Sequence, residues 1–63
     1  MRFQNWCWEG EGDRETGFLS REAAASDAAA ALYLDDEQRE TLLREGWLPL
    51  GRVSSVSIFN KND

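Results

Sequence analysis

The sequence predicts an α+β fold in which two helices pack on one face of a short antiparallel sheet of two or three strands. Residues 2–9 are rich in aromatic side chains, and residues 52–59 are rich in β-branched and hydroxyl side chains, as is typical of strands. Between these segments lie an alanine-rich stretch and a charged stretch, each preceded by a helix-start signal. We therefore expect one domain over residues 1–63, in the order strand, loop, helix, helix, strand.

The first strand carries apolar groups on both faces. Alternation places Trp6 and Trp8 on one face and Cys7 on the other. We expect one indole inside the core and the other partly exposed on the sheet, because a chain of this size is short of large core residues. Cys7 is expected to be packed and inert, since free cysteine is among the most buried residue types and no activating group lies close to it in sequence.

A glycine-spaced acidic stretch follows, and it predicts a turn or a long hairpin loop before Phe18. Four acidic residues alternate along it: Glu9, Glu11, Asp13 and Glu15. In an extended segment all four carboxylates would point the same way. Calcium requires six to eight oxygens in a shaped loop, and the usual order of aspartates, a fixed glycine and a closing glutamate is not in register here. We therefore expect a solvated loop, with no metal and no other cofactor.

The first helix is expected to begin after Ser20, whose hydroxyl can accept a hydrogen bond from a free backbone amide of the first turn. Glu22 complements the positive end of the helix dipole. The alanine-rich run has the highest intrinsic helix propensity and should continue to about Leu34. Because most helix stability comes from tertiary contact, we expect the alanine face to pack within the monomer.

The second helix is expected over residues 37–45. Asp35 is a candidate N-cap, and Gln38, three residues later, has the spacing of a capping box. Gly46 supplies a left-handed closing residue, after which Trp47 can fold back against the last helical turn.

The last strand is expected over residues 52–59. Its alternation breaks at Ser54 and Ser55, which predicts a β-bulge at this pair. The two terminal strands are expected to pair with each other, and at least one edge of so small a sheet remains open. Residues 60–63 are polar and are expected to form a frayed tail.

The composition argues against several classes of function. The 63 residues carry a formal net charge of −5, which disfavours direct binding to DNA or RNA. The chain has no histidine and one cysteine, so it lacks the usual groups of a catalytic centre and we expect no enzyme. No apolar run approaches the roughly 20 residues that cross a bilayer, and the N-terminus lacks a signal-peptide pattern. We expect a soluble cytoplasmic protein, which suits the single thiol.

The sequence favours a small interaction protein that acts as an inhibitor, a regulator or an accessory subunit of a larger protein. Compact acidic chains of this kind are common among phage and mobile-element products. The surplus of tryptophan and the negative charge favour a contact with a basic patch on the larger protein. The expected contact region contains seven residues: Trp6, Trp8, Glu9, Glu11 and Asp13, with Arg39 and Arg44 on the second helix.

Two alternatives remain open from the sequence. In the first, the chain is a self-associating module, such as a homodimer, in which strand edges or alanine faces of two copies complete one core. In the second, its carboxylates imitate the phosphates of a nucleic acid and block an enzyme that binds DNA or RNA. Basic residues interrupt the acidic surface, and this weakens the second alternative.

Overall fold

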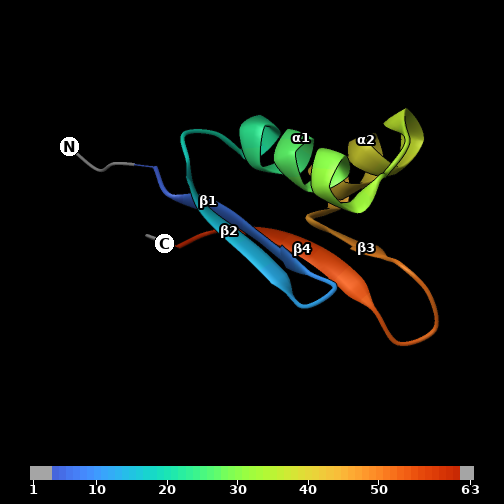
Figure 1. Ribbon diagram of the computed structural model, residues 1–63. Helices are drawn as coiled ribbons and strands as arrows, with labels where there is room; N and C mark the ends of the chain where they lie inside the picture. The colour runs from blue at the N-terminus through green and yellow to red at the C-terminus, as the bar shows by residue number, and fades with distance from the viewer. Residues whose placement is uncertain (1–3, 62–63) are drawn as a thin grey trace.

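The computed structural model describes residues 4–61 and confirms the α+β class, with two helices on one face of a four-stranded antiparallel sheet (Figure 1). The elements are β1 (Trp6–Gly10), β2 (Asp13–Phe18), α1 (Arg21–Leu32), α2 (Asp36–Glu45), β3 (Trp47–Pro49) and β4 (Ser55–Asn60). The strand order β2-β1-β4-β3 places the first and last strands side by side at the centre, as the sequence predicts. Among the described elements, none covers the face of the sheet opposite the helices, which we call the open face (Figure 1).

Of the two alternatives for the stretch after the first strand, a turn or a long hairpin loop, the turn is confirmed, because β1 and β2 form a tight hairpin. Gly10 pairs with Asp13, which leaves only Glu11 and Gly12 in the turn. Their φ angles are 53° and 81°, and positive φ at both central positions is the signature of a type I′ turn. This turn matches the right-handed twist of the flanking strands, so the polar stretch continues as a strand instead of leaving the sheet.

The expected course of the chain after the second helix is also wrong. Gly46 does close α2 in the left-handed region, with a φ of 85°. Trp47 then does not fold back on the helix but begins β3, a strand at the edge of the sheet. Pro49 is compatible with this position, because an edge strand does not need every backbone donor. With β2 and this strand, the sheet has four strands, whereas two or three are expected from the sequence.

The expected bulge at the two serines is absent, because only Ser55 belongs to β4. Ser54 lies in the preceding loop, where its carbonyl accepts a hydrogen bond of 2.9 Å from the backbone N–H of Leu50. The expected fraying of residues 60 and 61 is also wrong. Asn60 ends β4, and the backbone N–H of Lys61 donates to the carbonyl of Asn5 at 2.9 Å. Residues 62–63 lie outside the described part of the chain.

Both predicted helix starts are confirmed. The Ser20 hydroxyl accepts a hydrogen bond of 3.1 Å from the backbone N–H of Ala23. Asp35 and Gln38 form a complete capping box, with bonds of 2.8 and 3.0 Å between each side chain and the other residue's backbone N–H. The first helix ends two residues earlier than expected, because Tyr33 adopts the left-handed cap conformation with a φ of 58°.

The core lies between the sheet and α1, and its largest fully buried side chain is Trp8, which is 1% exposed. The buried side of α1 consists of four alanines: Ala24, Ala25, Ala28 and Ala29. The predicted packing of the alanine face within the monomer is therefore confirmed. Small side chains let the helix backbone approach the indole closely, and Leu42 and Val56 fill the remaining space. The strands are also close, since a Cβ added to Gly10 would lie 2.8 Å from the Cβ of Val56.

The substitution Ala28→Leu should lower the free energy of unfolding by about 1–3 kcal/mol, because the added atoms have no space between α1 and the sheet. Urea denaturation followed by circular dichroism measures the change. Ala30→Leu is the matched control on the exposed side of the same helix, and it should change stability by no more than about 0.5 kcal/mol. Equal effects of the two substitutions would contradict close packing of α1 on the sheet.

Candidate functional site

The two tryptophans of the predicted contact region have different surroundings. Trp8 lies in the core and has almost no surface to offer a partner. Trp6 is half-buried and packs against the edge of the same core. The prediction that one indole would be inside and the other partly exposed is therefore confirmed, and it removes Trp8 from any direct contact.

Strand alternation divides the predicted acidic residues between two faces of the sheet, although Glu9, Glu11 and Asp13 all line one groove at the hairpin turn. Glu9 pairs with Arg14 across the hairpin, and the two side chains form an ion pair of 2.9 Å. Asp13 pairs with Gly10 and precedes Arg14 in the strand. Because neighbouring strand residues point to opposite faces, the side chain of Asp13 lies on the helix side of the sheet. Glu11 occupies the turn. The expectation that these carboxylates would point the same way is wrong, because the tight turn reverses the chain in the middle of the series.

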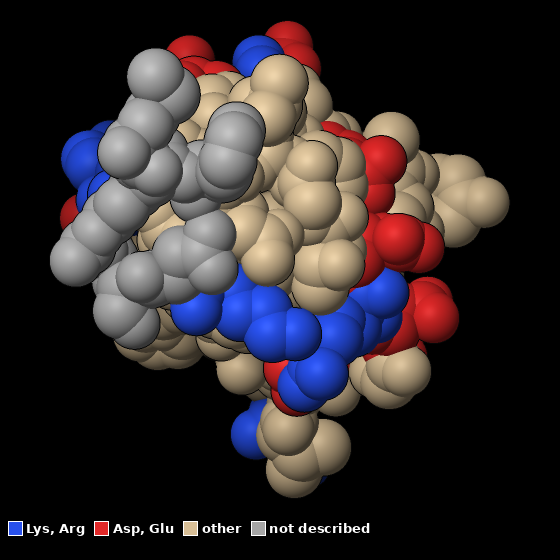
Figure 2. All heavy atoms as spheres, turned by 90° about the vertical axis from the view of Figure 1, so that its left-hand side faces the viewer, with Lys and Arg blue, Asp and Glu red and all other residues tan. Residues whose placement is uncertain are grey.

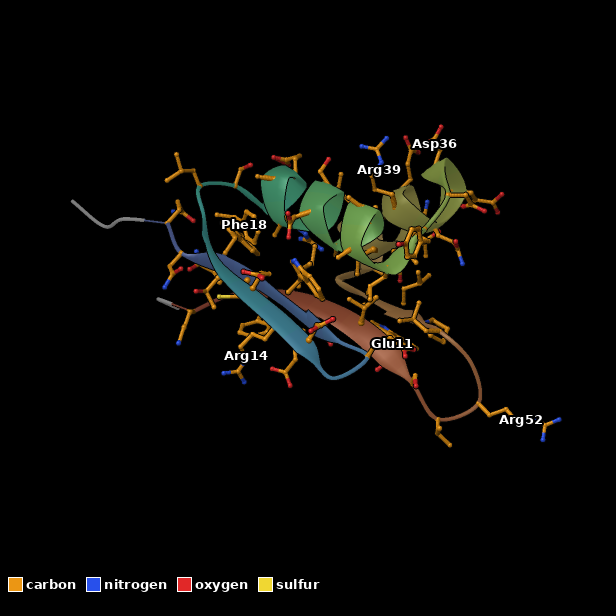
Figure 3. All side chains as sticks on the ribbon, in the orientation of Figure 1. Glu11, Arg14, Phe18, Asp36, Arg39 and Arg52 are labelled. Carbon is orange, nitrogen blue, oxygen red and sulfur yellow. The ribbon has the colours of Figure 1, made fainter. Side chains whose placement is uncertain are left out.

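The two predicted arginines lie in the helix layer. Arg39 is 4.0 Å from Asp36, and both point away from the sheet, on the opposite side of the molecule from Arg14 (Figure 3). Arg44 forms an ion pair of 3.2 Å with Glu45 at the end of α2. The seven predicted contact residues are therefore not gathered on one surface.

An acidic notch of about 420 Å³ opens where β2 passes α1. Three carboxylates line it, those of Asp13, Glu15 and Asp27, together with the edge of Trp8. The indole Nε1–H of Trp8 donates to Asp27 Oδ2 at 2.8 Å. No group of three or more His, Cys, Asp or Glu side chains among residues 4–61 is arranged to hold a metal ion. The clear role of Asp27 is therefore to satisfy the buried indole donor.

The open face is built from one row of side chains that crosses all four strands. Strand pairing places Arg14 beside Glu9, Glu9 beside Ser57, and Ser57 beside Trp47. Phe59, two residues after Ser57, lies on the same face and diagonally next to Trp47. The indole of Trp47 is 53% exposed and the ring of Phe59 is 39% exposed. Two large aromatic groups therefore face solvent at one end of the row, and a charged pair occupies the other.

Sequence reasoning missed this aromatic pair. From the sequence, Trp47 is expected to fold back on the last turn of the second helix, whereas Trp47, Leu48 and Pro49 alternate between an exposed, a buried and an exposed position in β3. In β4, the buried Ile58 next to Phe59 gives the same signal. Strand alternation could have identified the open face, but only if the short edge strand had been recognised first.

A groove of about 800 Å³ runs beside this row and is open to solvent. It lies between the β1–β2 turn and the loop before β4, from which Arg52 extends (Figure 3). Glu9, Val53 and Ser55 are among its lining residues.

Positive and negative side chains are unevenly distributed. Viewed along the sheet from the end where the termini lie, Lys and Arg atoms form a band across the lower half, and Asp and Glu atoms gather mainly at one side and at the top (Figure 2). Arg14 and Lys61 line a small hollow of about 70 Å³ with Cys7 and Phe59. Cys7 is buried, as predicted, and its thiol donates to the carbonyl of Asn5 at 3.3 Å.

The helix layer carries most of the negative charge. Between residues 20 and 46 there are seven acidic and three basic residues, a net charge of −4. The charged side chains of the open face include the acidic Glu9 and the basic Arg14 and Lys61. On this face, Glu9 is therefore accompanied by two basic side chains.

No family model, curated protein or solved structure matches this chain. Among the described residues, no helix is long and apolar enough to cross a membrane. The function is therefore inferred from the surfaces of the molecule.

The substitution Asp27→Ala should lower the free energy of unfolding by about 1–3 kcal/mol, because it leaves the buried indole N–H of Trp8 without its acceptor. Asp27→Asn retains an acceptor oxygen and should therefore lower the free energy of unfolding by a smaller amount. Denaturant titration monitored by tryptophan fluorescence distinguishes the two. If both variants lost the same stability, the hydrogen bond could not be the cause.

Proposed function

We propose that this chain is a small, non-catalytic protein-interaction module that binds another protein through the open face of its sheet. The observation that carries the proposal is the exposure of Trp47 and Phe59 side by side on a sheet face that no described element covers. An amphipathic sheet normally buries its apolar side chains against a second layer. A protein partner would supply that layer.

The composition of the open face supports a protein contact. Tryptophan is among the residues that contribute most to binding energy, and a polar rim around an aromatic centre excludes water from it. Here Trp47 and Phe59 provide the aromatic groups, while Glu9, Arg14 and Ser55 provide the polar surroundings. The contact region that we propose therefore keeps Glu9 from the sequence-based set and replaces Trp8 with Trp47.

The biological role that fits such a module is that of an inhibitor, a regulator or an accessory subunit in the cytoplasm. A compact chain without a reaction centre acts by occupying a surface on something larger. Association with a phage or another mobile element belongs to the same proposal, and it rests on the size and charge of the chain.

Acidic mimicry is a second candidate, favoured by the net charge of −4 on the helix layer. It predicts binding to a basic nucleic-acid enzyme that weakens as salt is added, because salt screens exposed charges. Glu9, Glu11 and Asp13 line one groove at the hairpin turn, but Arg14 lines it too and forms an ion pair with Glu9, which weakens the resemblance to a row of phosphates. Neutralising Glu11 and Asp13, which lie outside the proposed contact region, should leave binding unchanged if the open-face aromatics carry the contact.

Replacing both aromatic residues, in the variant Trp47→Ser/Phe59→Ser, should abolish capture of a partner protein by the immobilised chain. A tryptophan at the centre of an interface contributes roughly 2 kcal/mol or more, so its loss alone should weaken binding more than tenfold. Calorimetry with the captured protein measures the affinity. The control is Leu19→Ser, which removes an apolar side chain that is 78% exposed in the connection between β2 and α1. Undiminished binding by a folded double variant would contradict the proposal.

A further inference from the structure

We propose that the occupant of the open face is a second copy of this chain, packed face to face about a two-fold axis. The inference rests on the proposed function, because it names the partner of the same surface. Two-fold dimers are the commonest protein oligomers, and their interfaces bring one patch against itself. The question is whether the open face is complementary to itself.

The row across the sheet has the required complementarity. Its order is Arg14, Glu9, Ser57, Trp47, so a two-fold axis through its centre exchanges the two ends. Trp47 of each copy then lies over Arg14 of the other, and Glu9 lies over Ser57. A guanidinium on the face of an indole is a favourable cation–π pair, and the arrangement forms it twice. No two like charges of the row meet.

Charge also favours a second copy over other proteins. Face-to-face packing leaves both helix layers, each with a net charge of −4, on the outer sides of the dimer. Two sheets and the roughly 10 Å between them then separate these layers, a distance beyond the Debye length of about 8 Å at physiological salt. A basic partner would instead be attracted to the helix layer. The open face combines exposed aromatic groups with side chains of both charges, Glu9 and Arg14, so two copies can meet there without a block of like charge.

The thin core gives a physical reason for the dimer. The largest fully buried side chains are Trp8, Leu42, Val56 and Cys7, so a single copy encloses few large groups. Domains of about 60 residues often add support by oligomerisation. Packing two open faces together would bury Trp47 and Phe59 of both copies between two sheets, in the manner of a β-sandwich.

Sedimentation equilibrium of the full 63-residue chain over a wide concentration range tests this directly. The mass should rise from 7.2 kDa toward twice that value as concentration increases. Trp47→Ala should raise the dimer dissociation constant by about 30-fold or more, because a buried tryptophan is removed from two symmetric contacts. Leu19→Ala, which lies outside the open face, should leave the dissociation constant unchanged.

A charge-swapped variant separates the interface from the fold. Glu9→Arg combined with Arg14→Glu retains an ion pair within the chain but places a carboxylate over the partner's indole. It should weaken the dimer while leaving the thermal melting of the dilute monomer unchanged. A dimer unaffected by both the swap and Trp47→Ala would overturn the proposed arrangement.

The inference and the proposed function can fail separately. A chain that stays monomeric at every concentration overturns the second copy as occupant. In that case, capture of a different protein that is lost in Trp47→Ser/Phe59→Ser would still support the open face as a contact surface. Retention of such a protein by the double variant would overturn the proposed function as well.

Discussion

The close approach of an alanine helix to the indole of Trp8 is the constraint on which the rest of the structure depends. Four alanines of α1 face the sheet, so the helix lies near enough for a single large side chain to fill most of the space. Asp27 of the same helix accepts the hydrogen bond of the buried indole N–H. One helix thus supplies both the close packing around the indole and the acceptor for its N–H, while Leu42, Leu48, Val56 and Ile58 complete the core.

The small number of elements that enclose this core affects the opposite side of the sheet. Both helices are required on one face to enclose Trp8 and Leu42, and no further described element is available to cover the other. The open face consequently retains two exposed aromatic groups, Trp47 and Phe59. The interaction surface that we propose therefore results from the way in which the small core is enclosed. The same side chains would become part of a larger core if a partner packed against them.

The distribution of charge follows from the hairpin and the helix caps. The tight turn at Glu11 brings Arg14 beside Glu9, so the acidic groove at the hairpin also contains a basic side chain. The second helix collects carboxylates at its first turn, where they complement the helix dipole. Negative charge is thereby concentrated on the helix layer, and the face with the exposed aromatics carries little of it. This separation allows an acidic protein to present an apolar surface without strong repulsion.

The sequence alone determined the features that depend on neighbours three or four residues apart. Ser20 and Asp35 cap their helices as predicted, and Gly46 closes the second, because each uses hydrogen bonds within one turn. The tertiary structure decided which face each strand residue occupies. Whether Trp47 folds back on the helix or lies exposed in a strand depends on its pairing with Ser57, ten positions later, and on which side of the sheet the helices cover. Long-range pairing fixes both, and local propensity contains no information about either.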